Sequence, residues 1–362
     1  MKSHRIRQTQ GIRAAVIGAS GYSGMELARL LSRHPHIHQL SLFSSPVAHP
    51  SGGTHGTKGS PPTSHDPDFL IRKETRLTVR PFDEAELLES RPEIVFFATP
   101  NEISHELIPR YRDHPFRLID LSGSFRLRDA SLYPRWYGFT HTTPEMLSRF
   151  VYGLTEDNAT AISKAQWVAN PGCYATSVLL PLLPLVQEGW IDRGSPVICD
   201  CKSGVSGAGK QPTHHTHFCE VSDSFRAYSV FSHRHLPEIE QHLGLNAGDK
   251  LIFTPHLLPI NRGILSTLYL KTRSPRTEEE LRTLLVKGYA KAPFVRVFPS
   301  GELPQVKWVT HTNYCDIGVR VEESSSWVVM ISCLDNLVKG AAGQAIQNMN
   351  LMFNYAESSG LD

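Results

Sequence analysis

Three glycines at a spacing of three residues follow a short apolar run near the start of the chain. Residues 13–18 read as a buried strand ending at Gly18, then come Gly21 and Gly24, and residues 25–31 carry apolar side chains at helical spacing. Gly18 permits a tight turn, and Gly21 lets the backbone approach a pyrophosphate at the helix N-terminus. The pattern predicts a strand, a phosphate-binding loop and a helix, which is how a nucleotide-binding α/β sheet begins.

The alternation of strands and helices continues through the first third of the chain. We expect a helix over residues 102–112, a loop over 46–64, and strands at 38–43, 77–82, 94–98 and 117–122. This rhythm predicts an α/β fold with a doubly wound, Rossmann-type parallel sheet that binds ligands at the C-terminal ends of its strands. Thr99, Pro100 and Ser122 fall at such ends.

The residues after the second predicted strand indicate which dinucleotide is bound. Sites for NAD usually place an acidic residue there, where it binds the ribose 2′-hydroxyl. This chain has Ser44 and Ser45 instead, and no acidic residue stands between Glu26 and residue 66. Nothing there repels a 2′-phosphate, so the sequence favours NADP(H), with His49 and Lys58 as candidate supports for that phosphate.

A single cysteine stands where a long apolar helix begins in mid-chain. The order is a short strand, then Asn170-Pro171-Gly172-Cys173, then an apolar run to residue 186. A helix N-terminus presents unpaired N–H groups and partial positive charge, so it favours the thiolate, which attacks electrophiles. The alternative is a buried cysteine that acts as a small hydrophobe.

The second half of the chain has longer, alternating strands. They are expected at residues 196–202, 250–255, 264–271, 314–322 and 327–334, with a helix over 277–290. This pattern of longer, alternating strands predicts an α+β domain with a mixed sheet. A last helix over 336–355 is rich in small residues and is expected to pack back across the first domain. We therefore divide the chain into a cofactor-binding domain, 1–172 completed by 335–362, and a catalytic and oligomerisation domain, 173–334.

Composition excludes several classes of protein. A net charge of +2 argues against a nucleic-acid partner, and no run of eighteen apolar residues predicts a membrane span. The first ten residues lack the apolar core of a secretory signal and read as a frayed tail, so we expect a cytoplasmic protein without disulfides among its six cysteines. Cys199 and Cys201 fit alternate positions of a strand better than a metal site, and no metal is predicted.

Seven motifs carry a resemblance to a known family across nearly the whole chain. They lie at residues 18–24, 120–127, 170–174, 202–210, 233–239, 254–263 and 335–341. The sequence resembles the N-acetyl-γ-glutamyl-phosphate reductases, which are relatives of aspartate-semialdehyde dehydrogenase. The resemblance implies NADPH-dependent reduction of an acyl phosphate to an aldehyde in arginine biosynthesis, through a thioester on Cys173.

The resemblance also implies which residues form the site. Cys173 is the nucleophile and His233 the acid/base, with His235 as the alternative to His233. The substrate's two anionic ends are assigned to four residues: Arg126, Arg262, His235 and Lys210. The cofactor is assigned to Gly18, Ser20, Gly21, Tyr22, Ser23, Gly24, Ser44, Thr99, Pro100, Ser203, Gly204 and Asn336.

Some of these assignments have structural alternatives. Each arginine fits an ion pair within the protein as well as a substrate clamp, and Asn336 fits a helix N-cap. This chain also departs from the family pattern, because Ser124 stands where many members carry an aspartate before Phe-Arg. The role of that acid in orienting Arg126 is therefore in doubt.

Three other functions are weighed against the reductase. The same chemistry would serve an aminoadipyl phosphate in lysine biosynthesis, one methylene longer, and one methylene discriminates weakly. A cofactor-free acyl-transfer hydrolase would use Cys173 with His233 but leave the glycine loop without a role. A catalytically dead NADP-binding protein would not need either residue. The resemblance further implies a homodimer or homotetramer.

Overall fold

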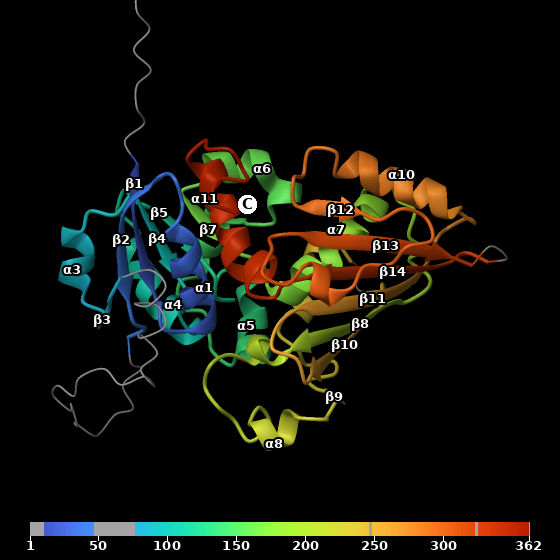
Figure 1. The fold of residues 1–362 in the computed structure, drawn as a ribbon, viewed down its shortest axis with the longest axis horizontal. Coiled ribbons are helices and arrows are strands. Elements are labelled where there is room, and N and C mark those ends of the chain that lie inside the picture. Colours follow the sequence, from blue (N-terminus) through green and yellow to red (C-terminus); the bar gives the residue numbers. More distant parts are fainter. Residues whose placement is uncertain (1–10, 47–76, 246–247, 323–324, 362) are drawn as a thin grey trace, which may run out of the picture.

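Two seven-stranded sheets lie side by side in the computed structural model, which describes residues 11–46, 77–245, 248–322 and 325–361. Figure 1 places the first sheet at the left, in blue to green, and the second at the right, in green to red. The predicted N-terminal tail, nearly all of the predicted 46–64 loop, and the candidate phosphate supports His49 and Lys58 lie outside the described residues.

The first sheet is entirely parallel, in the order β3-β2-β1-β4-β5-β7-β6. Its strands are β1 (Ile12–Ile17), β2 (Ile37–Phe43), β3 (Val79–Arg80), β4 (Ile94–Phe97), β5 (Arg117–Asp120), β6 (Phe150–Tyr152) and β7 (Trp167–Ala169). The associated helices are α1 (Tyr22–Leu31), α3 (Glu84–Glu89), α4 (Asn101–Leu107), α5 (Tyr133–Tyr137), α6 (Thr155–Lys164) and α11 (Gly343–Met352), with short 3₁₀ turns η1 (Ile108–Tyr111), η2 (Ala130–Leu132) and η3 (Pro144–Arg149).

Helices cover both faces of this first sheet. Leu27 of α1 and Ile346 of α11 pack with Val16 and Phe96 in one buried cluster, while Leu87 of α3 belongs to the cluster on the opposite face. A parallel sheet with both faces buried is the doubly wound arrangement that the alternating pattern predicts. The Rossmann-type sheet is therefore confirmed, and the last helix does return to it.

The second sheet is mixed, in the order β12-β13-β14-β11-β8-β10-β9. Its strands are β8 (Val197–Gly204), β9 (Arg226–Ala227), β10 (Leu251–Leu258), β11 (Ile264–Lys271), β12 (Val295–Val297), β13 (Cys315–Val321) and β14 (Trp327–Leu334). The helices that accompany it are α7 (Cys173–Gln187), α8 (Phe218–Val221), α9 (Leu236–Leu243) and α10 (Glu278–Gly288), with short turns η4 (Val205–Ala208), η5 (Val306–Trp308) and η6 (Val338–Ala342).

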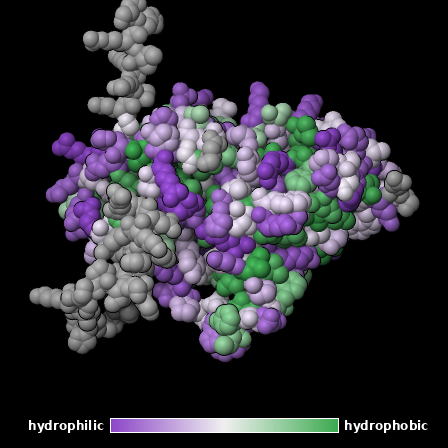
Figure 2. Space-filling view, in the orientation of Figure 1, coloured by the Kyte–Doolittle hydropathy of each residue, from purple (hydrophilic) through white to green (hydrophobic). Residues whose placement is uncertain are grey.

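Only one face of the second sheet is buried. Side chains of α7, α9 and α10 share a core with alternate residues of the strands, such as Cys199 and Phe253. The intervening residues, among them Ile252, Tyr269 and Trp327, keep part of their surface exposed. Figure 2 shows apolar patches between polar side chains over the region of β11, β13 and β14. The predicted α+β arrangement with a mixed sheet is confirmed.

Three predicted elements differ from the structure. The 77–82 strand reduces to the two residues of β3 at the sheet edge, where a single neighbour supplies hydrogen bonds. The 102–112 helix changes to 3₁₀ geometry at Ile108, next to Pro109, which has no N–H to donate. The 336–355 helix begins with the π-helical turn η6 before α11.

The cysteines match their predicted settings. Cys199 and Cys201 are both buried on one face of β8, and all six cysteines are free thiols. No helix in the described part of the chain combines the length and the apolar character needed to cross a membrane.

Candidate active site

The glycine loop between β1 and α1 has the geometry of a backbone cradle. Gly18 has a φ of +88°, and a Cβ atom there would lie 2.4 Å from the carbonyl oxygen of Ala98. A Cβ on Gly24 would lie 2.1 Å from the carbonyl oxygen of Gly18, whereas a Cβ on Gly21 would meet nothing closer than 3.6 Å. Gly18 and Gly24 are therefore needed to fold the loop, and Gly21 leaves open space at the start of α1.

The start of α1 has N–H groups available for an anion. Gly21 is the N-cap residue and offers no side chain to cap the helix, which begins at Tyr22 and Ser23. The N–H groups of Gly18 and Ala19 both donate to the carbonyl of Phe43, which ties the loop to the end of β2. The site thus fits a phosphate held by backbone N–H groups.

The other predicted cofactor residues of the first sheet follow neighbouring strands. Ser44 comes after β2, where its N–H donates to the carbonyl of Arg80 at 2.8 Å. Thr99 and Pro100 come after β4, and the Thr99 hydroxyl lies 2.6 Å from the Ser104 hydroxyl. Because the strands are all parallel, these residues lie along the same edge of the sheet as the glycine loop.

A loop of the second sheet reaches this edge. Ser203 and Gly204 end β8, and a Cβ on Gly204 would lie 2.7 Å from the carbonyl oxygen of Asn261, so the loops pack backbone to backbone. Farther along the same loop, Lys210 donates from Nζ to the carbonyl of Ser20 at 2.9 Å. Lys210, predicted to bind substrate, therefore contacts the cofactor loop directly.

Asn336 connects two loops of the second sheet. Its Oδ1 accepts from the N–H of Gly263 at 2.8 Å, and its Nδ2 donates to the Ser206 hydroxyl at 3.0 Å. The capping role considered for Asn336 belongs to Asp335, whose carboxylate accepts from the N–H of Leu337 at 2.8 Å. The structure therefore corrects the N-cap alternative for Asn336.

Cys173 is the first residue of α7 and lies against the C-terminal segment. A Cβ on Gly340 of η6 would lie 2.7 Å from Cβ of Cys173, so only a glycine fits there. Burial raises the pKa of the Cys173 thiol, although the charge of Arg126 and the N–H of Tyr174 act to lower it. The expected bias toward thiolate is therefore wrong for the structure as it stands, because burial outweighs the helix start.

His233 lies beside Tyr174, the residue that follows the predicted nucleophile Cys173. Its ring centre is 5.5 Å from that of Tyr174 and 5.3 Å from that of Phe253. Burial, with the nearby charge of Arg234, lowers the pKa of His233 to about 3. The N–H of His235 donates to Nδ1 of His233 at 3.1 Å, so the neutral ring carries its proton on Nε2.

His235 packs directly against Gly172, in the turn that precedes Cys173. A Cβ on Gly172 would lie 2.3 Å from Nε2 of His235, and Nη1 of Arg126 lies 3.5 Å from the same atom. Burial keeps the pKa of His235 well below its usual value, and the neighbouring His233, Arg126 and Arg234 lower it further. Although His235 is the N-cap residue of α9, its side chain makes no capping hydrogen bond.

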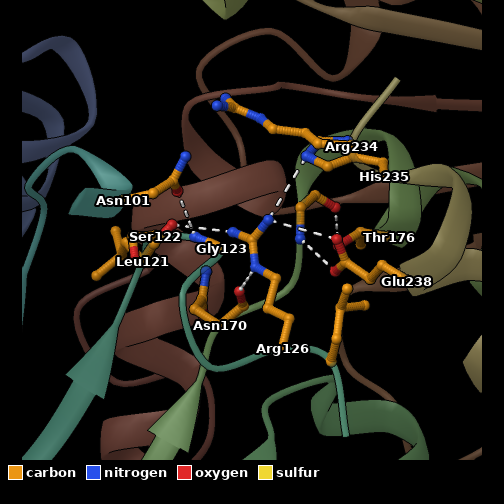
Figure 3. A network of polar contacts seen from close by, with 12 residues as sticks. Asn101, Leu121, Ser122, Gly123, Arg126, Asn170, Thr176, Arg234, His235 and Glu238 are labelled. Carbon is orange, nitrogen blue, oxygen red and sulfur yellow. Dashed lines mark hydrogen bonds and ion pairs between the residues drawn. The ribbon is translucent and has the colours of Figure 1, made fainter. Parts of the chain in front are cut away.

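Arg126 lies at the centre of a buried polar network (Figure 3). Its Nε donates to the carbonyl of Asn170 at 2.7 Å, and Nη2 donates to that of Leu121 at 2.9 Å. Nη1 lies 3.4 Å from Oε2 of Glu238. Most of the guanidinium is thus occupied within the protein, which favours the structural ion pair considered for Arg126.

Arg262 is bound by two carboxylates. One comes from Glu26 of α1 and the other from Asp335, whose Oδ2 lies 3.3 Å from Nη1 of Arg262. The same Nη1 lies 3.0 Å from Nδ1 of His311. This arrangement favours the ion-pair alternative for Arg262 and connects α1 to the segment that precedes η6.

Sequence reasoning missed Glu238. The position lies inside the 233–239 motif, and a carboxylate beside the apolar residues Leu236 and Ile239 at the start of a helix was the available signal. Glu238 is fully buried and pairs with Arg126. The carboxylate partner that Ser124 cannot supply is therefore provided by α9.

The chain matches two family models. The model described as "Semialdehyde dehydrogenase, NAD binding domain" covers residues 13–165, and "Semialdehyde dehydrogenase, dimerisation domain" covers residues 173–336. Aspartate semialdehyde dehydrogenase II from Vibrio cholerae, solved as a complex with ASA, superposes with a TM-score of 0.68 at 19% identity over 96% of this chain and 99% of that one. Aspartate semialdehyde dehydrogenase with NADP from Candida albicans gives 0.61 at 15% identity, over 95% and 98%. These structures share the fold.

Curated sequences are considerably closer. N-acetyl-gamma-glutamyl-phosphate reductase from Pelotomaculum thermopropionicum is 45% identical over 352 residues, which is 97% of each chain. The protein of the same name from Neisseria gonorrhoeae is 43% identical over 354 residues, again 97% of each. With this identity over nearly the full length, the chain belongs to the N-acetyl-gamma-glutamyl-phosphate reductase family.

Proposed function

We propose that this chain reduces N-acetyl-γ-glutamyl phosphate to N-acetylglutamate γ-semialdehyde with NADPH and releases phosphate, a step of arginine biosynthesis. The observation that carries the proposal is the position of Cys173. It begins α7, directly after the last strand of the cofactor-binding sheet, and it touches the returning segment at Gly340. A thiol at that junction suits attack on an acyl phosphate beside a bound dinucleotide.

The residues present fit a dinucleotide. The loop at Gly18, Gly21 and Gly24 is a cradle that Cβ atoms would fill at two of its three glycines. Ser44 after β2 brings no carboxylate that would repel a 2′-phosphate, which favours NADP(H). When bound, the nicotinamide would supply the hydride that reduces the thioester carbonyl.

The nucleophile's step belongs to Cys173 and its surroundings. The sulfur attacks the acyl carbon and a C–S bond forms, while the S–H bond and the C–O bond to phosphate break, so that phosphate leaves with its bonding electron pair and takes up the thiol proton. Because burial raises the thiol pKa, we propose that the thiol loses its proton only as its sulfur attacks the bound substrate. His233 is the proposed acid/base, and Nε2 is the nitrogen that would exchange the proton, because Nδ1 accepts from the N–H of His235.

Three of the four residues that were predicted to bind substrate are proposed for that role. Arg126 and His235 lie against the turn before Cys173, so they are the proposed neighbours of the acyl phosphate. Lys210 lies on the cofactor loop, where its charge would serve a phosphate of either ligand. Arg262 is held by Glu26 and Asp335, so its guanidinium is assigned to this ion-pair network and not to the substrate.

Domain division and assembly are proposed on similar grounds. Residues 1–172 with 335–362 would form the cofactor-binding domain, and 173–334 the catalytic and oligomerisation domain. The open face of the second sheet carries partly exposed Ile252, Tyr269 and Trp327, and it lies within the segment that matches a dimerisation domain. We propose that a second copy covers this face, in a homodimer or homotetramer, and that six free thiols suit the cytoplasm.

The decisive experiment compares wild type with Cys173→Ser. Turnover of N-acetyl-γ-glutamyl phosphate should fall by about 10³-fold or more, with NADPH affinity retained, because serine is a much weaker nucleophile at neutral pH. Cys219→Ser is the matched control, since that thiol is exposed on α8. Full activity of Cys173→Ser would overturn the mechanism, and preference for an aminoadipyl phosphate would overturn the substrate.

A further inference from the structure

Glu238 makes three contacts from a fully buried position in the first turn of α9. Its Oε1 accepts from the N–H of Gly172 at 2.8 Å and from the hydroxyl of Tyr152 at 2.7 Å. Its Oε2 lies 3.4 Å from Nη1 of Arg126. A buried carboxylate with this many partners is expensive to lose, because each partner would be left unsatisfied.

Two of these contacts act on the four-residue turn from Asn170 to Cys173. Gly172 is the residue directly before Cys173, and Arg126 donates to the carbonyl of Asn170, which begins the turn. Glu238 therefore holds the end of the turn directly and its start through the guanidinium. A side chain on Gly172 would collide with His235, so the turn has little freedom to shift.

We propose that Glu238 is a positioning residue for the nucleophile: it fixes the turn from Asn170 to Cys173 and holds Arg126 in place beside it. The arrangement connects α9 of the second sheet to the end of β7 of the first sheet, as Figure 3 shows from the Glu238 side chain and the Arg126 guanidinium. The turnover measurement described below rests on the proposed function, whereas the measurement of Cys173 alkylation does not.

The charges give this role a distinctive signature. Arg126 acts to lower the pKa of the Cys173 thiol, and Glu238 acts in the opposite direction. With both present the two charges act in opposite directions, and Arg126 has the larger effect. Removing only the carboxylate leaves the guanidinium unbalanced beside the thiol, and removing only the guanidinium leaves the carboxylate unbalanced. The two single variants should therefore shift thiol reactivity in opposite directions along the pH axis.

The groups that face this network come from several elements. His235 and Arg234 precede α9, and Tyr137 belongs to α5. Asp120, which ends β5, is buried with its carboxylate hydrogen-bonded to Ser122, and burial raises the pKa of Asp120. None of these groups is changed in the variants, so differences between variants report the Glu238–Arg126 pair itself.

The test measures the rate of Cys173 alkylation by iodoacetamide against pH, in a Cys219→Ser background that removes the exposed thiol. For Glu238→Gln, which keeps size and an oxygen acceptor for Gly172, we expect the profile to move down by about 0.5–1 pH unit. Arg126→Gln should move it up by at least as much, because Arg126 has the larger effect on the thiol. The double variant should lie between the two single variants.

Turnover gives the second readout. Glu238→Gln should lower kcat for the proposed reaction by about tenfold or more, with NADPH affinity unchanged, because a small misplacement of the nucleophile is costly. Tyr152→Phe, which removes one partner of the carboxylate and leaves both charges, should lower kcat much less and leave the alkylation profile within about 0.2 pH unit of wild type.

Two results of the alkylation test would overturn the positioning role of Glu238. Unchanged alkylation profiles in both single variants would reduce Glu238 to a structural group and overturn the proposal. An upward shift for Glu238→Gln would make it a base for Cys173 and would equally overturn it. If Glu238→Gln fails to fold, the upward shift of Arg126→Gln still carries the test. A wild type that does not turn over the acyl phosphate refutes the proposed function alone, since alkylation needs no substrate.

Discussion

The buried ion pair between Lys339 and Glu156 allows a quantitative stability prediction. Both side chains are almost completely buried, 0% and 1% exposed, and Nζ of Lys339 lies 2.5 Å from Oε1 of Glu156. At an effective dielectric constant of about 20 the attraction at that distance is about 7 kcal/mol, most of it offset by the desolvation of both charges. Nζ also donates to Oε1 of Gln347 at 2.7 Å.

Replacing Lys339 by methionine removes one partner and leaves the carboxylate of Glu156 buried and uncompensated. We expect the free energy of unfolding to fall by about 3–5 kcal/mol, because the cost of an unpaired buried charge is no longer offset. The double variant Lys339→Met/Glu156→Gln should recover at least about 2 kcal/mol of that loss, since it buries no net charge. Urea denaturation followed by far-ultraviolet circular dichroism measures both values.

A surface ion pair supplies the matched control. Arg282 and Glu279 lie one helical turn apart with 30% and 62% of their side chains exposed, so Arg282→Met should cost at most about 0.5 kcal/mol. The reasoning fails if Lys339→Met stays within about 1 kcal/mol of wild type, or if the double variant is less stable than the single one. Because Lys339 precedes the glycine that packs on Cys173, reductase activity should fall along with stability in the single variant.

Three further predictions follow from the site. Gly172→Ala, whose Cβ would lie 2.3 Å from Nε2 of His235, should lower kcat about 100-fold with NADPH affinity retained; turnover near wild type would contradict this packing. Gly18→Ala, at a φ of +88°, should weaken NADPH binding at least about tenfold in a fluorescence titration, and unchanged affinity would refute the cradle. The pKa of His141 is lowered to about 4 and that of His233 to about 3, so below pH 6.5 the unfolded chain binds more protons than the folded one. The free energy of unfolding should therefore fall between pH 6.5 and 4 by up to about 1.4 kcal/mol per pH unit for each histidine, and a flat profile in urea denaturation would contradict the assignment.

Local patterns in the sequence were enough to predict most elements of the fold. The strands predicted at 264–271 and 327–334 coincide with β11 and β14, since their alternation reflects one buried and one open face. The glycine loop was predictable for a similar reason: its spacing is set by contacts within one turn and its adjacent strand. The edge strand β3 was overestimated because the spacing of the apolar residues Leu77, Val79 and Phe82 does not reveal how many neighbours a strand has.

The partners of the charged site residues were not predictable. Arg126 pairs with Glu238, 112 residues away, and Arg262 with Glu26, 236 residues away, and no local pattern marks such pairs. The raised pKa of Cys173 was missed for the same reason. The helix start that favours thiolate is a local feature, whereas the burial that opposes it arises from tertiary packing.

The return of α11 to the first sheet has a consequence for synthesis on the ribosome. Ala345, Ile346 and Met349 of α11 share a buried cluster with Val16 and Phe96, so one face of that sheet is completed only by the end of the chain. At about 5–20 residues per second, the 190 residues after position 172 take about 10–38 s to be made. During that interval the nascent first sheet keeps an apolar surface that a chaperone can bind. A fragment ending at residue 172 should accordingly bind a hydrophobic dye that the full chain excludes.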